Sequence, residues 1–363
     1  MKQQERVSYI LEKFNAEAFR AHLIDWFKKE QRILPWRENQ DPYRVWVSEI
    51  MLQQTRVDTV IPYFNHFMEQ FPTPEALASA PEQDVLKAWE GLGYYSRARN
   101  LQNAVREVVE HYEGKVPDNK EQLGDLKGVG PYTKGAILSI AYDQAEPAVD
   151  GNVMRVLSRI LLVEEDIAKA STKTLFESLV RELISKEDPS AFNQGLMELG
   201  AIICTPKSPS CMLCPVQDEC RAFSEGKEGE LPIKSKKKKQ KKQPFVALFI
   251  ENEKGEVLVE QRPSNGLLAS LWQYPMVPIS EIAESDIPDW FRGEYGITID
   301  IDSTIDHVHH VFSHLIWDMS VKRAQVRKGT LDRENARFVS KEQIQKYPFP
   351  VSHQKIHKHL SFN

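Results

Sequence analysis

Four cysteines grouped in the second half of the chain are the residues best suited to bind a metal together. The chain has no other cysteine, and these four are spaced C-x6-C-x2-C-x5-C, at Cys204, Cys211, Cys214 and Cys220. A disulfide pairing is the alternative, but cytoplasmic thiols stay reduced, and closely spaced cysteines there usually bind metal. Four thiolates suit either zinc or an iron–sulfur cluster, so the spacing alone leaves the metal open.

A glycine-rich segment upstream of the cysteines has the pattern of an anion-binding turn. In LKGVGPYTKGAI, residues 126–137, Gly128 and Gly130 permit a tight turn that exposes backbone N–H groups just before a helix. Such a turn can bind a phosphate without side-chain charge. Asp150 follows in PAVDGNVMRVLSR, at the start of another predicted helix. Taken alone, this aspartate is best interpreted as an ordinary N-cap carboxylate.

Composition and charge are those of a globular protein with hydrophobic cores. Of 363 residues, 41% are hydrophobic and 27% are charged. No apolar run is long enough for a membrane-spanning helix, and the polar N-terminus has no signal-peptide pattern. We therefore expect a cytoplasmic protein with no membrane contact. The net charge of -5 does not exclude a nucleic-acid partner, because binding depends on where the basic residues cluster.

The elements that must position these residues fall into two parts. Residues 1–225 are predicted to be mostly helical, because apolar residues recur at three-to-four spacing and no alternating strand pattern interrupts them. Residues 244–363 are predicted to form a smaller α+β domain, since 245–262 has a hairpin pattern and 307–321 has strand-like composition. Residues 226–243 form the linker.

The linker contains a run of lysines, KSKKKKQKK at residues 234–242, with seven lysines in nine positions. A solvated spacer is the favoured interpretation, and a specific docking site is the alternative. Both can hold, because lysines beside a bound duplex release counterions whatever the DNA sequence.

The glycine turn, Asp150 about twenty residues later and the cysteine spacing together resemble the helix-hairpin-helix DNA glycosylases, over about residues 16–225. The resemblance implies two helical subdomains that bind duplex DNA between them, with Gly128 and Gly130 at the DNA backbone. It also implies that the four cysteines ligate a [4Fe–4S] cluster. In this family the aspartate is catalytic, which reverses the N-cap interpretation of Asp150.

Two positions distinguish adenine glycosylases of the MutY type from endonuclease III-like lyases. The lyases carry a nucleophilic lysine two positions after the second hairpin glycine, where this chain has Tyr132. Lys134 lies two residues further along the predicted helix and is a poor substitute. The segment VWVSEIMLQQTRV, residues 45–57, looks like the adenine glycosylase motif with its catalytic glutamate at Glu49. A solvated surface glutamate is the alternative, but the apolar neighbours of Glu49 favour a pocket.

Glu49 and Asp150 together suit cleavage of an N-glycosidic bond. The reaction needs a protonated leaving base and a stabilised oxocarbenium-like sugar, which glycosidases provide with two carboxyl groups in opposite protonation states. We expect burial to raise the pKa of Glu49, so that it protonates adenine, and a helix N-terminus to keep Asp150 ionised. The resemblance adds Asn152, which would orient water or Asp150, and Tyr132, which would pack against the reaction centre. Whether Asp150 bonds covalently to the sugar stays open.

The target adenine must leave the base stack to reach these groups. The resemblance places Arg37, in LPWR, and Gln194, in FNQG, in the adenine pocket. It also implies that Gln54, Leu92 and Tyr94 wedge into the duplex or fill the vacated space. For Tyr94, in GLGYY, a role as a core aromatic is an equal alternative.

The C-terminal part is similar to the second domain of the adenine glycosylases, which is related to Nudix hydrolases. RPSNGLLASLWQYPM, residues 262–276, carries this resemblance, whereas WFRGEYGI, residues 290–297, lacks the paired glutamates of a Nudix box. We therefore expect a reader of damaged bases rather than a hydrolase. In HVFSHL the resemblance implies that Phe312 wedges beside 8-oxoguanine and that Ser313 and His314 hydrogen-bond to it.

The histidines of this part have an alternative interpretation as metal ligands. The three concerned are His307, His309 and His310. Neither cysteines nor a matching carboxylate set accompany them, so we favour the reader.

These observations predict a monomeric, multidomain enzyme: an all-α helix-hairpin-helix glycosylase followed by an α+β Nudix-like domain. We expect it to excise adenine paired with 8-oxoguanine or guanine in double-stranded DNA, as a step of base excision repair at the bacterial nucleoid. A bifunctional endonuclease III-like lyase is one alternative, against which Tyr132 argues. A non-catalytic, DNA-bound redox sensor is the other, against which Glu49 and Asp150 argue.

Overall fold

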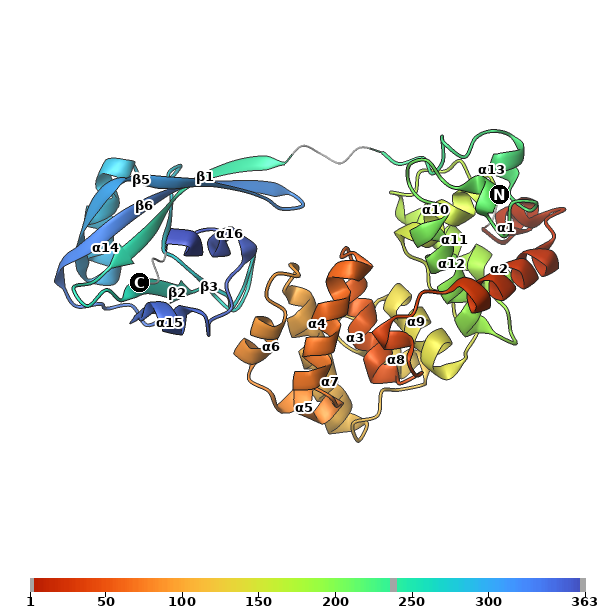
Figure 1. Cartoon of the computed structure of the whole chain (residues 1–363), viewed down its shortest axis with the longest axis horizontal. Coiled ribbons are helices and arrows are strands. Elements are labelled where there is room, and N and C mark those ends of the chain that lie inside the picture. The colour runs from red at the N-terminus through yellow and green to blue at the C-terminus, as the bar shows by residue number, and fades with distance from the viewer. Residues whose placement is uncertain (1–2, 236–239, 360–363) are drawn as a thin grey trace. The chain divides into compact units, whose positions relative to one another are not determined.

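The computed structural model describes residues 3–235 and 240–359. They form two compact units, which are described separately (Figure 1). The first comprises Met1–Ala78 and Asn103–Lys236, and the second comprises Ser79–Gln102 and Lys237–Asn363. In the described ranges no helix has both the length and the apolar character needed to cross a bilayer.

The first unit is helical, as predicted for this region. Its helices, including two that extend into residues 79–102, are α1 (Gln3–Leu11), α2 (Ala16–Glu30), η1 (Pro35–Arg37), α3 (Pro42–Leu52), α4 (Val57–Gln70), α5 (Pro74–Ser79), α7 (Ser96–His111), α8 (Lys120–Asp125), α9 (Pro131–Tyr142), α10 (Gly151–Ile160), α11 (Ala170–Leu183), α12 (Pro189–Ile202), η2 (Cys211–Leu213) and α13 (Arg221–Ser224).

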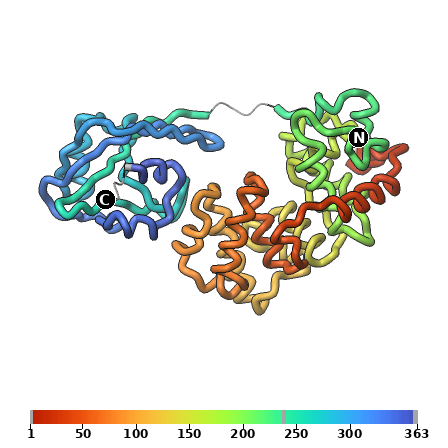
Figure 2. The backbone as a smooth tube through the Cα atoms, in the orientation of Figure 1, coloured from red at the N-terminus to blue at the C-terminus, as the bar shows by residue number. Residues whose placement is uncertain are grey.

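The N-terminal helices of this unit pack against helices that lie more than 150 residues later in the chain. Figure 2 shows the red N-terminal segment beside the green one, and α2 packs on α12. Phe19 and Phe192 meet edge to face at 6.0 Å between ring centroids in a fully buried core. Gly195 permits this approach, because a Cβ atom there would lie 3.2 Å from Leu23 Cγ. The packing holds one side of α12 in place.

The predicted glycine turn joins α8 to α9. Asn119 caps α8, since its side chain accepts hydrogen bonds from the backbone of the first turn, and Pro131 occupies the first position of α9. Gly128 has φ +82°, a conformation that glycine adopts without strain. Gly128 and Gly130 are both exposed, which leaves the turn accessible.

The second unit is built on one mixed seven-stranded sheet, the α+β architecture predicted for the C-terminal part. The strands are β1 (Lys241–Glu251), β2 (Val257–Gln261), β3 (Trp272–Gln273), β4 (Met276–Pro278), β5 (Ile297–Val311), β6 (Leu315–Gly329) and β7 (Ala336–Val339). Its helices are α6 (Glu82–Ala88), η3 (Glu284–Asp286), α14 (Ile287–Tyr295), α15 (Lys341–Ile344), α16 (Val351–Gln354) and η4 (His357–His359). Apolar clusters cover both faces of the sheet.

The order β3-β2-β1-β6-β5 places β1 at the centre of the sheet, parallel to β6 and antiparallel to β2. The predicted hairpin over residues 245–262 is therefore confirmed, with Gly255 at φ +74° in its turn. The strand-like segment 307–321 becomes the end of β5 and the start of β6. Phe312 N donates to Leu315 O at 2.8 Å, which closes a two-residue loop of Ser313 and His314 between these strands.

The second unit also contains residues 79–102, which the sequence analysis assigned to the helical region of residues 1–225. The physical reason is a set of polar contacts within this unit. Gln83 Oε1 accepts from Trp272 Nε1 at 2.9 Å, and Glu90 Oε1 accepts from the Phe349 N–H at 2.7 Å. Such contacts join segments far apart in sequence, so a linear division of the chain misses them.

Candidate active site and metal centre

A cavity in the first unit brings together six of the predicted site residues. It is lined by side chains from η1, α3, α9, α10 and α12. The six predicted residues on its wall are Arg37, Glu49, Tyr132, Asp150, Asn152 and Gln194. The residues predicted for the adenine pocket and the predicted pair of carboxyl groups therefore line one cavity.

Glu49 is a buried carboxyl group that can hold a proton at neutral pH. It lies on α3, whose start is fixed by Asp41, and its side chain is 5% exposed. Burial raises the pKa of Glu49 to about 7, although a hydrogen bond from Tyr132 opposes the shift. The Tyr132 hydroxyl donates to Glu49 Oε2 at 2.5 Å. A proton on this carboxyl group then belongs on Oε1, the oxygen that Tyr132 does not contact.

Asp150 is both a helix cap and part of the cavity wall, so the two interpretations of this residue are compatible. Its Oδ1 accepts from Val153 N at 2.7 Å at the start of α10, and its Oδ2 accepts from Asn152 Nδ2 at 3.0 Å. Burial raises the pKa of Asp150, and these hydrogen bonds oppose the rise. The hydrogen bonds at the helix N-terminus therefore favour the ionised form of Asp150, as predicted, but burial raises its pKa by more than they lower it.

The backbone that leads to Asp150 lies directly against α9. A Cβ atom on Gly135 would stand 1.8 Å from Pro147 O, a distance that excludes any side chain. Because Tyr132 is on the same helix, this contact sets the position of Asp150 relative to Tyr132.

Two hydrogen-bonding residues of this unit were missed by the sequence analysis. One is Arg155, which donates to Asn152 Oδ1 at 2.9 Å and to Cys204 O at 2.9 Å. It thereby joins the cavity to the first cysteine. Asn152 lies three residues earlier on the same helix, but Cys204 follows α12, and no local pattern predicts that contact.

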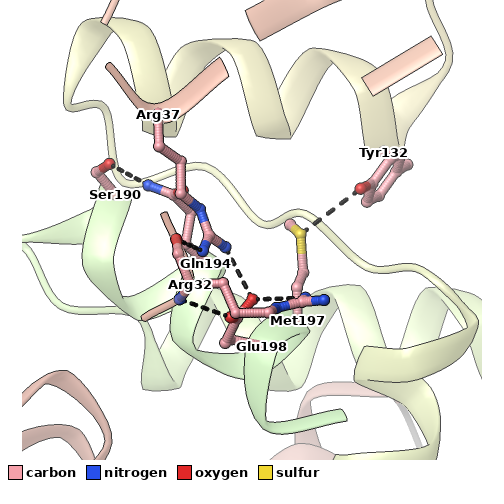
Figure 3. A network of polar contacts seen from close by, with 7 residues as sticks. All are labelled: Arg32, Arg37, Tyr132, Ser190, Gln194, Met197 and Glu198. Carbon is pink, nitrogen blue, oxygen red and sulfur yellow. Dashed lines mark hydrogen bonds and ion pairs between the residues drawn. The ribbon is translucent and has the colours of Figure 1, made fainter. Parts of the chain in front are cut away.

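The other is Glu198, whose carboxylate is 1% exposed and anchors two arginines (Figure 3). It accepts from Arg32 Nε at 2.7 Å and from an Arg37 guanidinium nitrogen at 2.9 Å. Burial alone would raise the pKa of Glu198, but these hydrogen bonds lower it to about 2. Its position four residues after Gln194 on α12 is the signal that could have identified it.

The same network fixes the side-chain amide of Gln194. Arg37 Nε donates to Gln194 Oε1 at 3.0 Å, and Gln194 Nε2 donates to Ser190 Oγ at 3.1 Å. The amide oxygen and nitrogen therefore have assigned partners, and the orientation of the amide follows from them.

The four cysteines line a second cavity of the first unit, next to Arg159. Arg159 donates to Cys204 Sγ at 3.2 Å, and burial raises the pKa of the Cys214 thiol to about 12. Such buried thiols need a cationic centre to become thiolates. Yet among the described residues no three His, Cys, Asp or Glu side chains converge as they would around a single ion. Four thiols that line one cavity can, once deprotonated, serve as ligands of a metal centre. Nor do three such side chains converge at the described histidines of the second unit.

Lys134, the weak candidate for a lyase nucleophile, is not on the wall of the Glu49 cavity. Its Nζ lies against Gly124 of α8, where a Cβ atom would be 3.0 Å away. Tyr132, on the same helix, lines this cavity.

The predicted reader residues border a cavity of the second unit, together with Arg99 and His310. Tyr94 and Ser313 are joined by a hydrogen bond of 3.0 Å between their hydroxyl groups. Phe312 is half-buried and packs against Trp317 at 4.9 Å between ring centroids, whereas Ser313 and His314 are exposed.

The three predicted wedge residues differ in exposure. Tyr94 is 46% exposed, which disfavours its interpretation as a core aromatic, and Leu92 is 6% exposed. Gln54 is exposed in the turn after α3, with φ +62°. In the first unit Gln54, and in the second unit Tyr94, therefore have side chains available to a duplex.

Comparisons with known proteins agree with this geometry. The model of the HhH-GPD superfamily of base excision DNA repair proteins matches residues 47–182, that of the NUDIX domain matches 246–359, and that of the iron-sulfur binding domain of endonuclease III matches 204–220. The adenine DNA glycosylase of Rattus norvegicus is 36% identical over 353 residues, covering 82% of this chain and 68% of the relative. That of Schizosaccharomyces pombe is 33% identical over 367 residues, covering 82% and 80%.

The chain belongs to the adenine DNA glycosylase family. A solved thermostable thymine-DNA glycosylase is also similar, with a TM-score of 0.51 and 28% identity over 58% of this chain and 97% of that one. The predicted helical glycosylase fold, Nudix-like domain and iron–sulfur cofactor are confirmed. As a member of the adenine DNA glycosylase family, the chain is an enzyme of base excision repair. The four cysteines would hold its iron–sulfur cluster.

The raised pKa of Glu49 predicts how the rate of adenine excision depends on pH. Only the protonated acid can assist departure of the base, so the single-turnover rate constant should fall about tenfold per pH unit above about 7. The Glu49→Gln variant should excise adenine far more slowly, and its rate constant should not show this fall above about pH 7. A wild-type rate that stays constant from pH 6 to 9 would contradict the assignment of the acid.

The stability of the Glu49→Gln variant provides a control for correct folding. The pKa of Glu49 is higher folded than unfolded, so its contribution to stability falls as pH rises from about 4.5 to about 7. Removing the buried charge should therefore raise the unfolding free energy at pH 8 by up to about 3 kcal/mol. Urea titration measures this, and a variant that is stable but inactive places the defect in the chemistry.

The Glu198 network predicts that removing its charge lowers the stability of the protein. Glu198→Gln keeps the shape but leaves Arg32 and Arg37 without a charged partner, which should cost about 2–4 kcal/mol of unfolding free energy. Glu38→Gln is the matched control, because it removes an exposed partner of Arg44 and should cost less than about 1 kcal/mol. Equal losses in the two variants would show that the network has no special role.

Proposed function

We propose that the protein is a monofunctional glycosylase that removes adenine paired with 8-oxoguanine, or with guanine, and leaves an abasic site. The observation that carries this proposal is the Tyr132–Glu49 hydrogen bond in the cavity that Asp150 also lines. An acid and a second carboxylate are present there, and the amine nucleophile of a lyase is not on the cavity wall. We further propose that it acts as a monomer on duplex DNA in the cytoplasm, at the bacterial nucleoid.

In the proposed reaction the bond between the sugar and adenine breaks, and its electron pair stays on the base. Glu49 supplies the proton that adenine N7 gains, so the base leaves as a neutral species. Asp150 stabilises the positive charge that develops on the sugar, and Asn152 holds this carboxylate by its hydrogen bond. Water then adds to the sugar carbon, and its proton returns to Glu49. Each atom and charge is thereby accounted for.

The adenine pocket would use the fixed amide of Gln194. Its Oε1 already accepts from Arg37 but keeps a second lone pair, which suits the amino group of adenine. A base with a carbonyl oxygen in place of the adenine amino group would be repelled by Gln194 Oε1, because both oxygens are hydrogen-bond acceptors. Gln194 would therefore favour adenine over bases that carry a carbonyl there.

The reader cavity of the second unit would recognise the opposite base. 8-Oxoguanine differs from guanine in having an N–H donor at N7 and a carbonyl oxygen at C8. A serine hydroxyl can accept from the first or donate to the second, and Ser313 is exposed at the tip of its loop. Tyr94, bonded to Ser313, and Phe312 would stack beside the lesion, and His314 would add a hydrogen bond.

One assay tests the reaction type. A duplex with a single 8-oxoguanine·adenine pair is incubated with the protein, and the strands are separated with and without alkali. We expect cleavage of the adenine strand only after alkali, because an abasic site is left. Cleavage without alkali would identify a lyase, and no cleavage in either case would exclude the proposed reaction.

A substitution in the reader loop tests the recognition of the opposite base. Ser313→Ala should lower the preference for 8-oxoguanine over guanine by about tenfold, since one lost hydrogen bond is worth about 1–1.5 kcal/mol. Single-turnover rates and dissociation constants on the two duplexes measure the preference. Ser285→Ala, at a serine outside the cavity, is the control. An unchanged preference would dismiss the reader role of Ser313.

A further inference from the structure

The lysine-rich linker ends inside the sheet of the second unit. Lys241 and Lys242 are the first residues of β1, and both are exposed. They pair in parallel with Leu315 and Ile316 of β6, the residues that directly follow the reader loop. Figure 1 shows the start of β1 beside the turn between β5 and β6. The last lysines of the run therefore have fixed places in the structure.

Two hydrogen bonds join this end of the linker to the reader loop itself. Gln240 Nε2 donates to Phe312 O at 2.8 Å, and Lys241 N donates to His314 O at 3.3 Å. They hold the backbone on both sides of Ser313. A free spacer would not need such contacts, because its only task is to connect two parts of the chain.

The charges around this loop are mainly basic. No carboxylate is among the residues that line the reader cavity, where Arg99, His310 and His314 lie. Lys355 is near, since its Nζ donates to His309 O at 3.3 Å. The nearby acid is Asp318, which is 3.9 Å from His309 Nδ1 and opposite Pro244 in the strand register. Among the described contacts Lys241 and Lys242 have no carboxylate partner, so their charges are available to a ligand.

The position of the two lysines on the strand lets them reach an anion beyond the sheet edge. Among the described strands only β6 pairs with residues 241–243, since β4 begins to pair at Phe245 and the Ile279 N–H donates to Pro244 O at 3.3 Å. On the other edge, no backbone hydrogen bond among the described residues reaches Lys241 or Lys242. Lysine side chains are long and flexible, and their ammonium groups bind phosphate as point charges.

We propose that Lys241 and Lys242 bind phosphates of the DNA strand that carries the lesion, next to the base that the reader loop contacts. The end of the linker is then part of the DNA-binding surface rather than a spacer. This inference rests on the proposed function of the loop as the reader of 8-oxoguanine. Phosphate contacts carry no base information, so they add affinity equally to damaged and undamaged duplexes.

Edge lysines also have a structural use, because charge on an open strand discourages pairing with another chain. The two explanations differ in the dependence of DNA binding on salt. Each phosphate contact contributes about 0.9 to the slope of log K against log salt concentration, whereas lysines that only protect an edge contribute none.

The test compares Lys241→Gln/Lys242→Gln with Lys254→Gln/Lys328→Gln. Both double variants remove two positive charges. The control lysines are exposed and lie away from the start of β1, Lys254 in the turn after β1 and Lys328 near the end of β6. Dissociation constants are measured between 50 and 200 mM salt, for an 8-oxoguanine·adenine duplex and for an undamaged one. A Glu49→Gln background prevents turnover.

We expect the slope to fall by about 1.8 in the linker variant and to stay unchanged in the control. The affinity lost would be about tenfold larger at 50 mM than at 200 mM salt, and equal for both duplexes. Equal slopes in the two double variants would overturn the proposal. So would self-association of the linker variant with an unchanged slope, which would identify edge protection as the role of these lysines.

A second readout separates this inference from the proposed function. The wild-type protein is assayed, under single-turnover conditions, for excision of adenine from the same 8-oxoguanine·adenine duplex. If adenine is excised but the linker variant has the same salt-dependence slope as the control variant, only the proposed lysine–phosphate contacts are rejected. If the wild type does not excise adenine from this duplex, the proposed function fails, whatever the slopes show.

Discussion

The buried carboxyl group of Glu49 is the constraint on which the catalytic unit depends. A carboxylate loses most of its hydration when its side chain is 5% exposed, so the group keeps its proton up to a pH of about 7. Burial also raises the pKa of Tyr132 well above its usual value, so this phenol stays a donor. The proton, the hydrogen bond and the orientation of Glu49 are consequences of the same exclusion of water.

Three of the carboxyl groups that line this cavity, Glu49, Asp150 and Glu198, differ in the number of hydrogen-bond donors around them, and their pKa values differ accordingly. Glu49 receives one strong hydrogen bond, and burial raises its pKa to about 7. Asp150 receives bonds from Val153 and Asn152, which oppose the effect of burial. Glu198 receives four from two arginines, and its pKa falls to about 2. One cavity can therefore hold the proposed acid, the proposed second catalytic carboxyl group and a carboxylate that stays charged at neutral pH.

The sequence predicted those parts of the site that are carried by local patterns. The cysteine spacing, the glycine turn and the cap position of Asp150 each fall within one short segment, and Glu49 stood out by its apolar neighbours. Arg155 and Glu198 were missed because their roles depend on partners brought together by tertiary packing. The assignment of residues 79–102 differed for the same reason, since Glu90 and Gln83 bond to residues that follow more than 180 positions later. Periodicity predicts helices and strands, but it does not say which of them meet.

Two kinds of DNA recognition place opposite demands on the reader loop. Reading a base requires a small, exposed group in a fixed position, and a two-residue hairpin loop offers Ser313 in this way. Binding phosphates requires several positive charges, which such a short loop has no room to carry. A neighbouring strand can supply them, provided that it is attached to the loop. The bonds from Gln240 and Lys241 to the loop backbone provide that attachment, so the proposed phosphate contacts would lie next to the residue that reads the lesion without taking part in the reading.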